Sequence, residues 1–561
     1  MSLALQRGRV RSRTLMHAIT RRSVGMALGA LLLLAYAANL LRMNDTMSLL
    51  SMPRAAKYEY KQPTEPPAVS ETAEMAEQRR KREEQQRVCF EERDYGMIQV
   101  VRATNRTLCT NTTGMDAALH DMLSTYVSYD SPRTEITGTL VTNLWVDLRN
   151  AETFKPIASI AQDGHLHDPR FKYASVGVRC ACHVSQDQRE PMTPRVWEWM
   201  FGEHPENEQY WHFCKAFADA KALEVLGSGA ATQPWDKKLI RRSGGVKKVP
   251  KPASGTWPYT VHHVKTNAII LGRRDDHNPF FQISITLNAW IMMKVLDWSP
   301  ETTQLVYFDT GYPSPIDDLQ RLMLAPTLPV VSGASILGSV LRFDHALIAP
   351  FEFSGPMMRH LNDDEPCHRN ALIRDFRAQS LEKFHVSDFK RDPASCTITV
   401  ISRRPYKGRM VQRKWLNEEA ILERMRVEYG RDRTFFKHGT CKFQSLDFVQ
   451  LTLEQQMRAV VESDILIGMH GAGMANVIWA RPETAVVEIF PGKRRRWGFR
   501  NLCQFVGCNW VEFRGGTDVG PGDADNSCDK LISYADWHTF FDPVIRNTIL
   551  GLEQRIAGTF R

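Results

Sequence analysis

A glycine-rich turn between a strand and a helix is the part of the sequence whose residue types point most clearly to chemistry. ILIGM (465–469) predicts a buried strand, HGAG (470–473) follows it, and a short helix is expected at 474–480. Glycines allow another group to approach the backbone closely. The amides at a helix start attract anions such as a diphosphate. A nucleotide is therefore the expected ligand, and a simple packing turn is the structural alternative.

Charged residues near the ends of neighbouring strands add to this chemistry. Arg403 and Arg404 end the β-branched run 396–404, and Glu488 lies near the end of the run 485–490. A planar guanidinium group suits phosphate oxygens, and a carboxylate is suited to accept hydrogen bonds from ribose hydroxyls. The structural alternatives are a surface ion pair with Glu418 or Glu419 for the arginines and a strand-end cap for Glu488.

The elements that would position these residues alternate between strand and helix. Buried strands are expected at 396–404, 465–469 and 485–490, and a helix is expected at 417–430, with Gly430 as its C-cap. A further helix opens with the capping box Thr452-Leu-Glu-Gln455. This alternation predicts a parallel, Rossmann-like half of an α/β fold, in which ligands bind beyond the carboxyl ends of the strands.

The combination of these motifs resembles glycosyltransferase family 61. Its pattern has a strand ending in S-R or R-R, a basic residue before N-E, the HGAG turn, and a later proline and glutamate, and it spans about residues 395–491. Weaker similarity covers 262–356, where RFDHALIAPFEFSGPM (342–357) is similar to a segment of the plant xylosyltransferases of this family. The resemblance implies a UDP-sugar site built from Arg403, Arg404, Lys414, His470, Gly471, Ala472, Gly473 and Glu488.

The resemblance also implies a fold and a reaction. The fold is GT-B-like, with two facing Rossmann-like domains, and the reaction is an inverting transfer from a UDP-sugar, with xylose preferred, to an N-glycan or another glycan. No metal or other cofactor is implied, so that arginines and helix-start amides would stabilise the departing UDP. A protein O-GlcNAc transferase of the same family and a catalytically silent glycan-binding relative are the two alternatives.

The expected catalytic base lies before Pro279. Relatives carry an acid and an Asn, followed by a His and a second acid; this chain keeps the first acids and Asn278 but lacks the later pair at that spacing. The candidate bases are therefore Asp276, Asp275 and His277, provided that one lies within hydrogen-bond reach of the acceptor hydroxyl. A turn or a helix cap is the structural alternative. The D-x-D motif Asp523-Ala-Asp525 is interpreted as an exposed acidic loop instead of a metal site.

The basic surplus of the chain is confined to its amino terminus. The net charge is +9, but seven arginines and no acid lie within the first 42 residues, so the rest of the chain is close to neutral and gives no reason to expect nucleic-acid binding. The uncharged run 24–41 predicts one transmembrane signal anchor behind a cytosolic basic tail at 1–23. This topology predicts a type II membrane protein. Together with it, the family resemblance implies the Golgi membrane, with the endoplasmic reticulum as second choice. A cleaved signal peptide and a mitochondrial presequence are the alternatives.

The rest of the chain divides into three parts. A stem is expected at 42–87, an acceptor-side α/β domain at 88–390, and a nucleotide-sugar-binding domain with a tail at 391–561. Glycosylation sequons at Asn105 and Asn111 and eleven cysteines fit an oxidising, lumenal compartment. The odd number leaves at least one cysteine unpaired. The candidate disulfides are Cys503 with Cys508, and Cys180 or Cys182 with Cys214.

Overall fold

The computed structural model of the chain forms two compact units, Met1–Ala76 and Glu77–Arg561. The described residues of the second unit hold two large sheets and a two-stranded sheet of β13 (Thr517–Val519) and β14 (Asp529–Leu531). The described residues are 73–109, 125–149, 151–152, 169–171, 176–179, 261–273, 278–311, 313–349, 352–387, 392–405, 411–430, 435–520 and 527–559. Several predicted features lie outside these ranges: the span 24–41, Asn111, Cys180, Cys182, Cys214, Asp275, Asp276, His277, Asp523 and Asp525.

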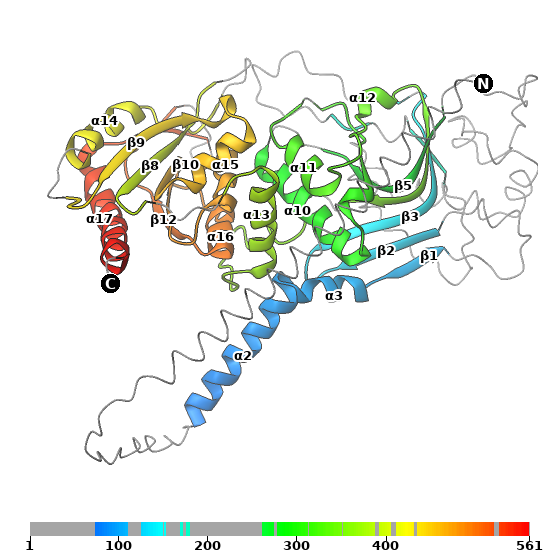
Figure 1. The fold of residues 1–561 in the computed structure, drawn as a ribbon, viewed down its shortest axis with the longest axis horizontal. Coiled ribbons are helices and arrows are strands. Elements are labelled where there is room, and N and C mark those ends of the chain that lie inside the picture. The colour runs from blue at the N-terminus through cyan, green and yellow to red at the C-terminus, as the bar shows by residue number, and fades with distance from the viewer. Residues whose placement is uncertain are drawn as a thin grey trace, which may run out of the picture. The chain divides into compact units, whose positions relative to one another are not determined.

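Five parallel strands form the sheet of the C-terminal half (Figure 1). They are β8 (Ser395–Ser402), β9 (Thr440–Asp447), β10 (Ile465–Met469), β11 (Ala485–Ile489) and β12 (Asn509–Phe513), in the order β12-β11-β10-β8-β9. The predicted strands and their parallel pairing are confirmed. Counted from β8, the order is the 2-1-3-4-5 of flavodoxin-like sheets, in which ligands bind at the switch point between the first and third strands. That point lies between β8 and β10.

Helices cover both faces of this parallel sheet. On one face, α14 (Glu418–Tyr429) and α17 (Tyr534–Thr559) pack against strand residues such as Ile467. On the other face lie α15 (Leu453–Val461), the 3₁₀ helix η5 (Ala472–Trp479) and α16 (Gly498–Val506). Every residue of β10 and β11 is buried, as expected for strands covered on both sides. The capping box of α15 and the C-cap Gly430 of α14 are confirmed, and the helix expected at 474–480 is η5.

The sheet of the N-terminal half is mixed (Figure 1). Its order is β1 (Arg106–Cys109), β2 (Thr125–Ser131), β3 (Ile136–Asp147), β7 (Val340–Ile348), β5 (Val261–Leu271) and β6 (Thr303–Tyr307), with β4 (Gly177–Arg179) beside β3. The strands β7, β5 and β6 are parallel, whereas β1 to β4 join antiparallel. The expectation of a second Rossmann-like domain therefore holds only for β7-β5-β6. Consecutive strands joined by a short turn, as β2 and β3 are, must run antiparallel.

A buried helix fills the centre of the N-terminal half. The helix α10 (Pro279–Leu296) begins after Asn278, whose side chain caps it by accepting a hydrogen bond from the amide of Phe280 at 3.2 Å. Within the described ranges, α10 alone is long and apolar enough to cross a membrane, but 78% of it is buried inside the protein, as in a core helix. Its Trp290 packs on Phe376 of α13 (Ala371–Lys383), which stacks on Trp479 of η5. One hydrophobic core thus joins both halves.

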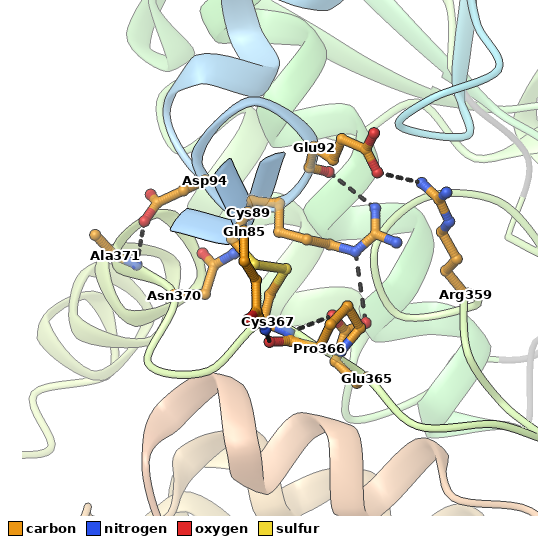
Figure 2. The surroundings of a disulfide bond; sticks show 11 residues. Gln85, Cys89, Glu92, Asp94, Arg359, Glu365, Pro366, Cys367, Asn370 and Ala371 are labelled. Atoms are coloured by element: carbon orange, nitrogen blue, oxygen red, sulfur yellow. Dashed lines mark hydrogen bonds and ion pairs between the residues drawn. A yellow bond between two sulfur atoms is a disulfide. The ribbon is translucent and has the colours of Figure 1, made fainter. Parts of the chain in front are cut away.

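The loop before α13 ties together three elements of the chain (Figure 2). A disulfide joins Cys367 to Cys89 of α2 (Ala73–Arg93), a helix that spans the end of the expected stem. Next to it, Asp94 accepts hydrogen bonds from the first amides of α13, and Arg93 pairs with Glu365 inside the protein at 3.5 Å. The amides of residues 369 and 370 donate to carbonyls of α16, each at 2.9 Å. The loop therefore joins α2, α13 and α16.

Two further disulfides are formed among the described residues. Cys396 and Cys441 pair across β8 and β9, and the predicted bridge between Cys503 and Cys508 is confirmed. Cys528 is a free, buried thiol, in agreement with an odd number of cysteines.

Candidate donor-binding site

The HGAG turn lies at the switch point of the parallel sheet. Gly468, two residues before the turn, pairs with Ile401 of β8, and Arg403 follows that strand. The guanidinium group of Arg403 lies directly on the backbone of Gly471, because a Cβ atom placed on Gly471 would be 1.9 Å from Nη1 of Arg403. Any side chain at position 471 would displace the end of this flexible arginine. Glycine therefore allows Arg403 to lie against the backbone here.

The second glycine of the turn has more room. A Cβ atom on Gly473 would meet only Cγ2 of Ile401, at 3.4 Å, which is an ordinary contact. Ala472 and Gly473 are half-buried, so the start of η5 is accessible and not sealed by packed side chains. The two glycines thus differ. The lack of a side chain at Gly471 makes room for Arg403, whereas Gly473 leaves the start of η5 accessible.

His470 is held in place by a buried carboxylate. Its Nδ1 lies 2.5 Å from Oε1 of Glu488, and Oε2 of Glu488 accepts a hydrogen bond from Nε1 of Trp510 at 2.8 Å. The imidazole stacks on Phe490, with 4.9 Å between ring centroids, and lies against Phe499. The exposed fraction is 6% for His470 and 0% for Glu488. Both oxygens of Glu488 are bonded within the protein, and its predicted ribose contact stays a prediction.

The histidine and the glutamate together are electrically neutral near pH 7. Burial raises the pKa of Glu488 to about 8, against the hydrogen bond from Trp510, which lowers it. Burial also holds the pKa of His470 well below its usual value, and nearby arginines lower it further. These arginines are Arg494, Arg413, Arg403 and Arg496. The pair therefore keeps one shared acidic proton, and the positive charge of the site comes from arginine alone.

Arginines from three separate segments form the positive cluster around His470. Arg403 follows β8, Arg413 precedes α14, and Arg494 and Arg496 follow β11. Burial lowers the pKa of Arg494 to about 10, and the like charges of Arg413 and Arg496 contribute to this shift. Burial also lowers the pKa of Arg413. Like charges held together in a partly buried place favour a bound anion.

Two of the predicted donor-site residues are engaged elsewhere. Arg404 forms an exposed ion pair with Glu419 at 3.1 Å, which is the structural alternative that its position allowed. Lys414 pairs with Asp529, with 3.2 Å between Nζ and Oδ2. The structure therefore brings together Arg403, His470 and Gly471, with Glu488 behind the histidine, and assigns Arg404 and Lys414 to ion pairs.

Arg413, Arg494 and Arg496 were not among the predicted site residues. The signal for the last two is the run Lys493-Arg494-Arg495-Arg496, which begins four residues after β11 ends. Such a run usually marks a solvated loop, but at the carboxyl end of a parallel strand it also suits anion binding. Arg413 stands beside Lys414 and carries no distinct signal.

The candidate bases Asp275, Asp276 and His277 lie between two fixed points at the carboxyl end of β5. Before them, Arg273 is paired with Asp309, with 2.6 Å between Nη2 and Oδ1, and also donates to Asp317 at 2.7 Å. After them, Asn278 caps α10. The three residues themselves are not described, so their role stays a prediction.

Two other predicted features concern the protein surface and metals. Asn105 is exposed, as a glycosylation acceptor must be, and its use stays a prediction. Among the described residues, no group of three or more histidine, cysteine, aspartate and glutamate side chains is arranged to hold a metal ion.

Comparison with known proteins places these motifs in a family. Residues 315–487, from α11 (Asp317–Leu324) to β11, match the model of Glycosyltransferase 61. The chain is 22% identical to beta-1,2-xylosyltransferase RCN11 of Oryza sativa subsp. japonica, over 42% of this chain and 46% of that protein. It is 21% identical to beta-1,2-xylosyltransferase of Arabidopsis thaliana, over 30% of this chain and 37% of that protein. It is 24% identical to EGF domain-specific O-linked N-acetylglucosamine transferase of Gallus gallus, over 28% of this chain and 27% of that protein.

These matches span less than half the length of each relative. The family match nevertheless includes β8, β10, the HGAG turn and most of β11, which are the elements that form the site. It confirms the resemblance to glycosyltransferase family 61 that the motifs predict.

Proposed function

We propose that the chain is an inverting glycosyltransferase of the secretory pathway that transfers a sugar, with xylose preferred, from a UDP-sugar to an N-glycan or another glycan. The observation that carries this proposal is the arginine cluster at the switch point, in which Arg403 lies on the backbone of Gly471. A diphosphate offers this cluster two groups of anionic oxygens, which guanidinium groups and helix-start amides bind well. The similarity to two beta-1,2-xylosyltransferases supports xylose as the sugar.

We assign the two halves of the protein to the two substrates, in a GT-B-like arrangement. The parallel sheet of β8 to β12 carries the arginine cluster and would bind the UDP-sugar. The N-terminal half carries the candidate bases after β5 and would bind the acceptor. The parallel part of its sheet, β7-β5-β6, supports this assignment, because its strand ends offer a second ligand-binding edge.

The proposed reaction is a single displacement at the anomeric carbon. The base is Asp276, or else Asp275 or His277, and it takes the proton from the acceptor hydroxyl. The oxygen of that hydroxyl forms a bond to the anomeric carbon on the face opposite UDP. The bond from that carbon to the diphosphate oxygen breaks, and its electron pair moves onto the diphosphate. The arginine cluster stabilises this charge in place of a metal ion. The configuration of the sugar carbon is inverted.

The alternative function of the same family is protein O-GlcNAc transfer. The similarity to the chicken EGF domain-specific enzyme favours it, since the matched identity is as high as that to the plant enzymes. A catalytically silent glycan-binding relative is the third reading, favoured by the missing His and acid after Asn278. A screen with UDP-xylose and UDP-GlcNAc separates the three functions by the donor that releases UDP. No UDP release with any donor, together with retained glycan binding, would favour the silent relative.

We place the enzyme in the Golgi membrane as a single-pass type II protein, with the endoplasmic reticulum as second choice. The arginine-rich tail and the apolar run 24–41 support this topology. The three disulfides support a lumenal body, because such bonds persist in oxidising compartments. Glycosidase treatment of the expressed protein, with and without Asn105→Gln, tests the lumenal orientation through the loss of one glycan.

The decisive test is UDP binding by the Arg403→Ala variant of the full chain. Calorimetry at pH 7 should show affinity lower by about 10- to 100-fold, the effect of losing one charge-assisted contact. Its melting temperature should stay unchanged, because Arg403 is only half-buried. Arg404→Ala is the matched control and should bind UDP like the wild type, because Arg404 is paired with Glu419. Wild-type affinity in Arg403→Ala would remove the phosphate role of this residue.

A further inference from the structure

We infer that Glu488 and Trp510 are positioning residues that make His470 a hydrogen-bond donor to the diphosphate of the sugar donor, and that loss of one proton from the His470–Glu488 pair ends this interaction. The inference rests on the proposed function, since it concerns the same site. It goes beyond that function because it assigns a role to the buried carboxylate of Glu488 and predicts how binding of the sugar donor depends on pH.

The position of the imidazole is fixed on several sides. The backbone amide of His470 donates to the carbonyl of Ile489 at 2.8 Å, and the ring is stacked on Phe490 and packed against Phe499. Its Nδ1 is engaged with Glu488 at 2.5 Å. Nε2 is therefore the ring nitrogen available for a ligand at the neighbouring Gly471, where Arg403 also lies.

Trp510 determines which oxygen of Glu488 carries the proton. The indole Nε1–H can only donate a hydrogen bond, so Oε2 of Glu488, 2.8 Å away, must accept it. The acidic proton consequently sits on Oε1, the oxygen that faces Nδ1 of His470. When Oε1–H donates to Nδ1, the remaining ring proton is on Nε2. The histidine then presents an N–H group to a phosphate oxygen, although the imidazole itself is neutral.

Loss of one proton reverses the role of Nε2. The ionised carboxylate of Glu488 then accepts a hydrogen bond from Nδ1–H, and Nε2 becomes an acceptor without a proton. Two acceptors, the bare Nε2 and a phosphate oxygen, repel each other. The pair also gains a negative charge next to the diphosphate. Donor binding therefore weakens when the pair loses its proton.

The groups packed around the pair decide where this change falls on the pH scale. Burial raises the pKa of Glu488 to about 8, so the change is expected in mildly alkaline solution. The charged groups that act on His470 are Arg494, Arg413, Arg403 and Arg496, and those that act on Glu488 are Glu512, Arg514 and Arg494. All the arginines disfavour an imidazolium, so the proton is held on the glutamate side.

The variant Glu488→Gln tests the inference because it imitates the protonated acid. Its amide N–H donates to Nδ1, and its carbonyl accepts the hydrogen bond from Trp510, so Nε2 keeps its proton at every pH. UDP binding to the full chain is measured by calorimetry between pH 7 and 9, where the terminal phosphate of UDP is already ionised. Wild-type affinity should fall by about tenfold over this range. Glu488→Gln should match the wild type at pH 7 and stay constant to pH 9.

A second variant keeps the inference testable if the glutamine does not fold. Trp510→Phe keeps an aromatic ring and removes the hydrogen bond that lowers the pKa of Glu488. Its affinity loss should therefore begin at higher pH than that of the wild type. A merely structural role for Glu488 or Trp510 would lower the affinity equally at all pH values.

The possible outcomes separate this inference from the proposed function. UDP binding with identical pH profiles in the wild type, Glu488→Gln and Trp510→Phe would overturn the inference and leave the proposed function standing. No UDP binding by the wild-type chain at pH 7 would overturn the proposed function, and the inference with it. A flat profile in Glu488→Gln beside a falling wild-type profile supports both.

Discussion

Arginines lie near the carboxyl ends of the parallel strands in both large sheets. Carboxylates neutralise the arginine at the edge of the N-terminal sheet, whereas the arginines at the edge of the C-terminal sheet lie among like charges. After β5, Arg273 is 3% exposed and is paired with Asp309 and Asp317. Burial is the largest single influence and lowers its pKa, but the charge and hydrogen bond of Asp309, together with Tyr307 and Asp317, raise the pKa above the ordinary value of arginine. After β11 and before α14, burial and like-charged neighbours lower the pKa of Arg494, and burial lowers that of Arg413.

The difference shows that a place at the ligand-binding edge does not by itself make an arginine a binding residue. At the first edge the protein supplies ionised carboxylates to Arg273, so this arginine is part of the fold. At the second edge the fully buried carboxylate, Glu488, holds a proton at neutral pH and bonds His470. It therefore contributes little negative charge to the arginines, and an anionic substrate meets a positive field there.

The largest expected effect comes from removing the arginine of the first edge. Arg273→Ala leaves Asp309, which is 1% exposed, as a buried charge without its main partner. Such losses cost about 3–5 kcal/mol. The free energy of unfolding, measured with denaturant on the full chain, should fall by this amount, whereas Arg403→Ala should leave it unchanged. Equal stability of the two variants would break the comparison between the edges.

The next effect concerns the proton on the second edge. Because burial raises the pKa of Glu488 to about 8 from 4.5, the folded state holds this proton more tightly than the unfolded state. Its contribution to stability is full below about pH 4.5 and is lost as the pH rises toward 8. Glu488→Gln removes this loss and should stabilise the protein by roughly 2–4 kcal/mol at pH 8, but not at pH 4.5.

Thermal melts at both pH values measure this effect of Glu488→Gln. Glu512→Gln, on the neighbouring β12, provides the control, because this side chain is exposed and its replacement should change stability little at either pH. A pH-independent difference between Glu488→Gln and the wild type would show that Glu488 is ionised in the folded state.

A smaller effect is expected from the two glycines of the turn. Gly471→Ala places a methyl group where Nη1 of Arg403 lies, so UDP affinity should fall by about 10-fold or more. Gly473→Ala meets only an ordinary contact with Ile401 and should change affinity by less than about threefold. Calorimetry with UDP compares them directly. Equal losses would indicate that the turn responds to any added bulk and that Arg403 has no special place on it.

No effect is expected from removing metal ions. If arginines stabilise the departing UDP, turnover should be the same in EDTA and in its absence. The rate of UDP release, measured with the preferred donor, tests this expectation. Loss of turnover in EDTA that manganese restores would mean that a cation does the work assigned to the arginine cluster.

The parallel half was predictable because its patterns are local. The strand β10 was expected at 465–469 and extends over Ile465–Met469, since an unbroken apolar run before a glycine turn has few other interpretations. The capping box of Thr452 with Gln455 and the bridge between Cys503 and Cys508 likewise depend on residues only a few positions apart. Family resemblance added the ligand class and named Arg403 and the HGAG turn.

The features of the site that were not predicted depend on residues far apart in the sequence, which only the fold brings together. The register that pairs Gly468 with Glu488 puts the carboxylate behind His470, and no spacing rule predicts that hydrogen bond. Arg494 and Arg496 belong to a charged run, a feature that usually marks a solvated loop. The strands β1 and β2, of four and seven residues, were not separately predicted.

The bond between Cys89 and Cys367 joins two residues 278 positions apart in the sequence and closes the chain between them into one covalent ring. A protease that cuts a single peptide bond anywhere inside this ring cannot release either fragment. The cleaved protein would travel as one species on a gel until a reducing agent opens the sulfur bridge. A single cut inside the ring would therefore escape any assay run without reductant, and the cut protein would keep both of its fragments.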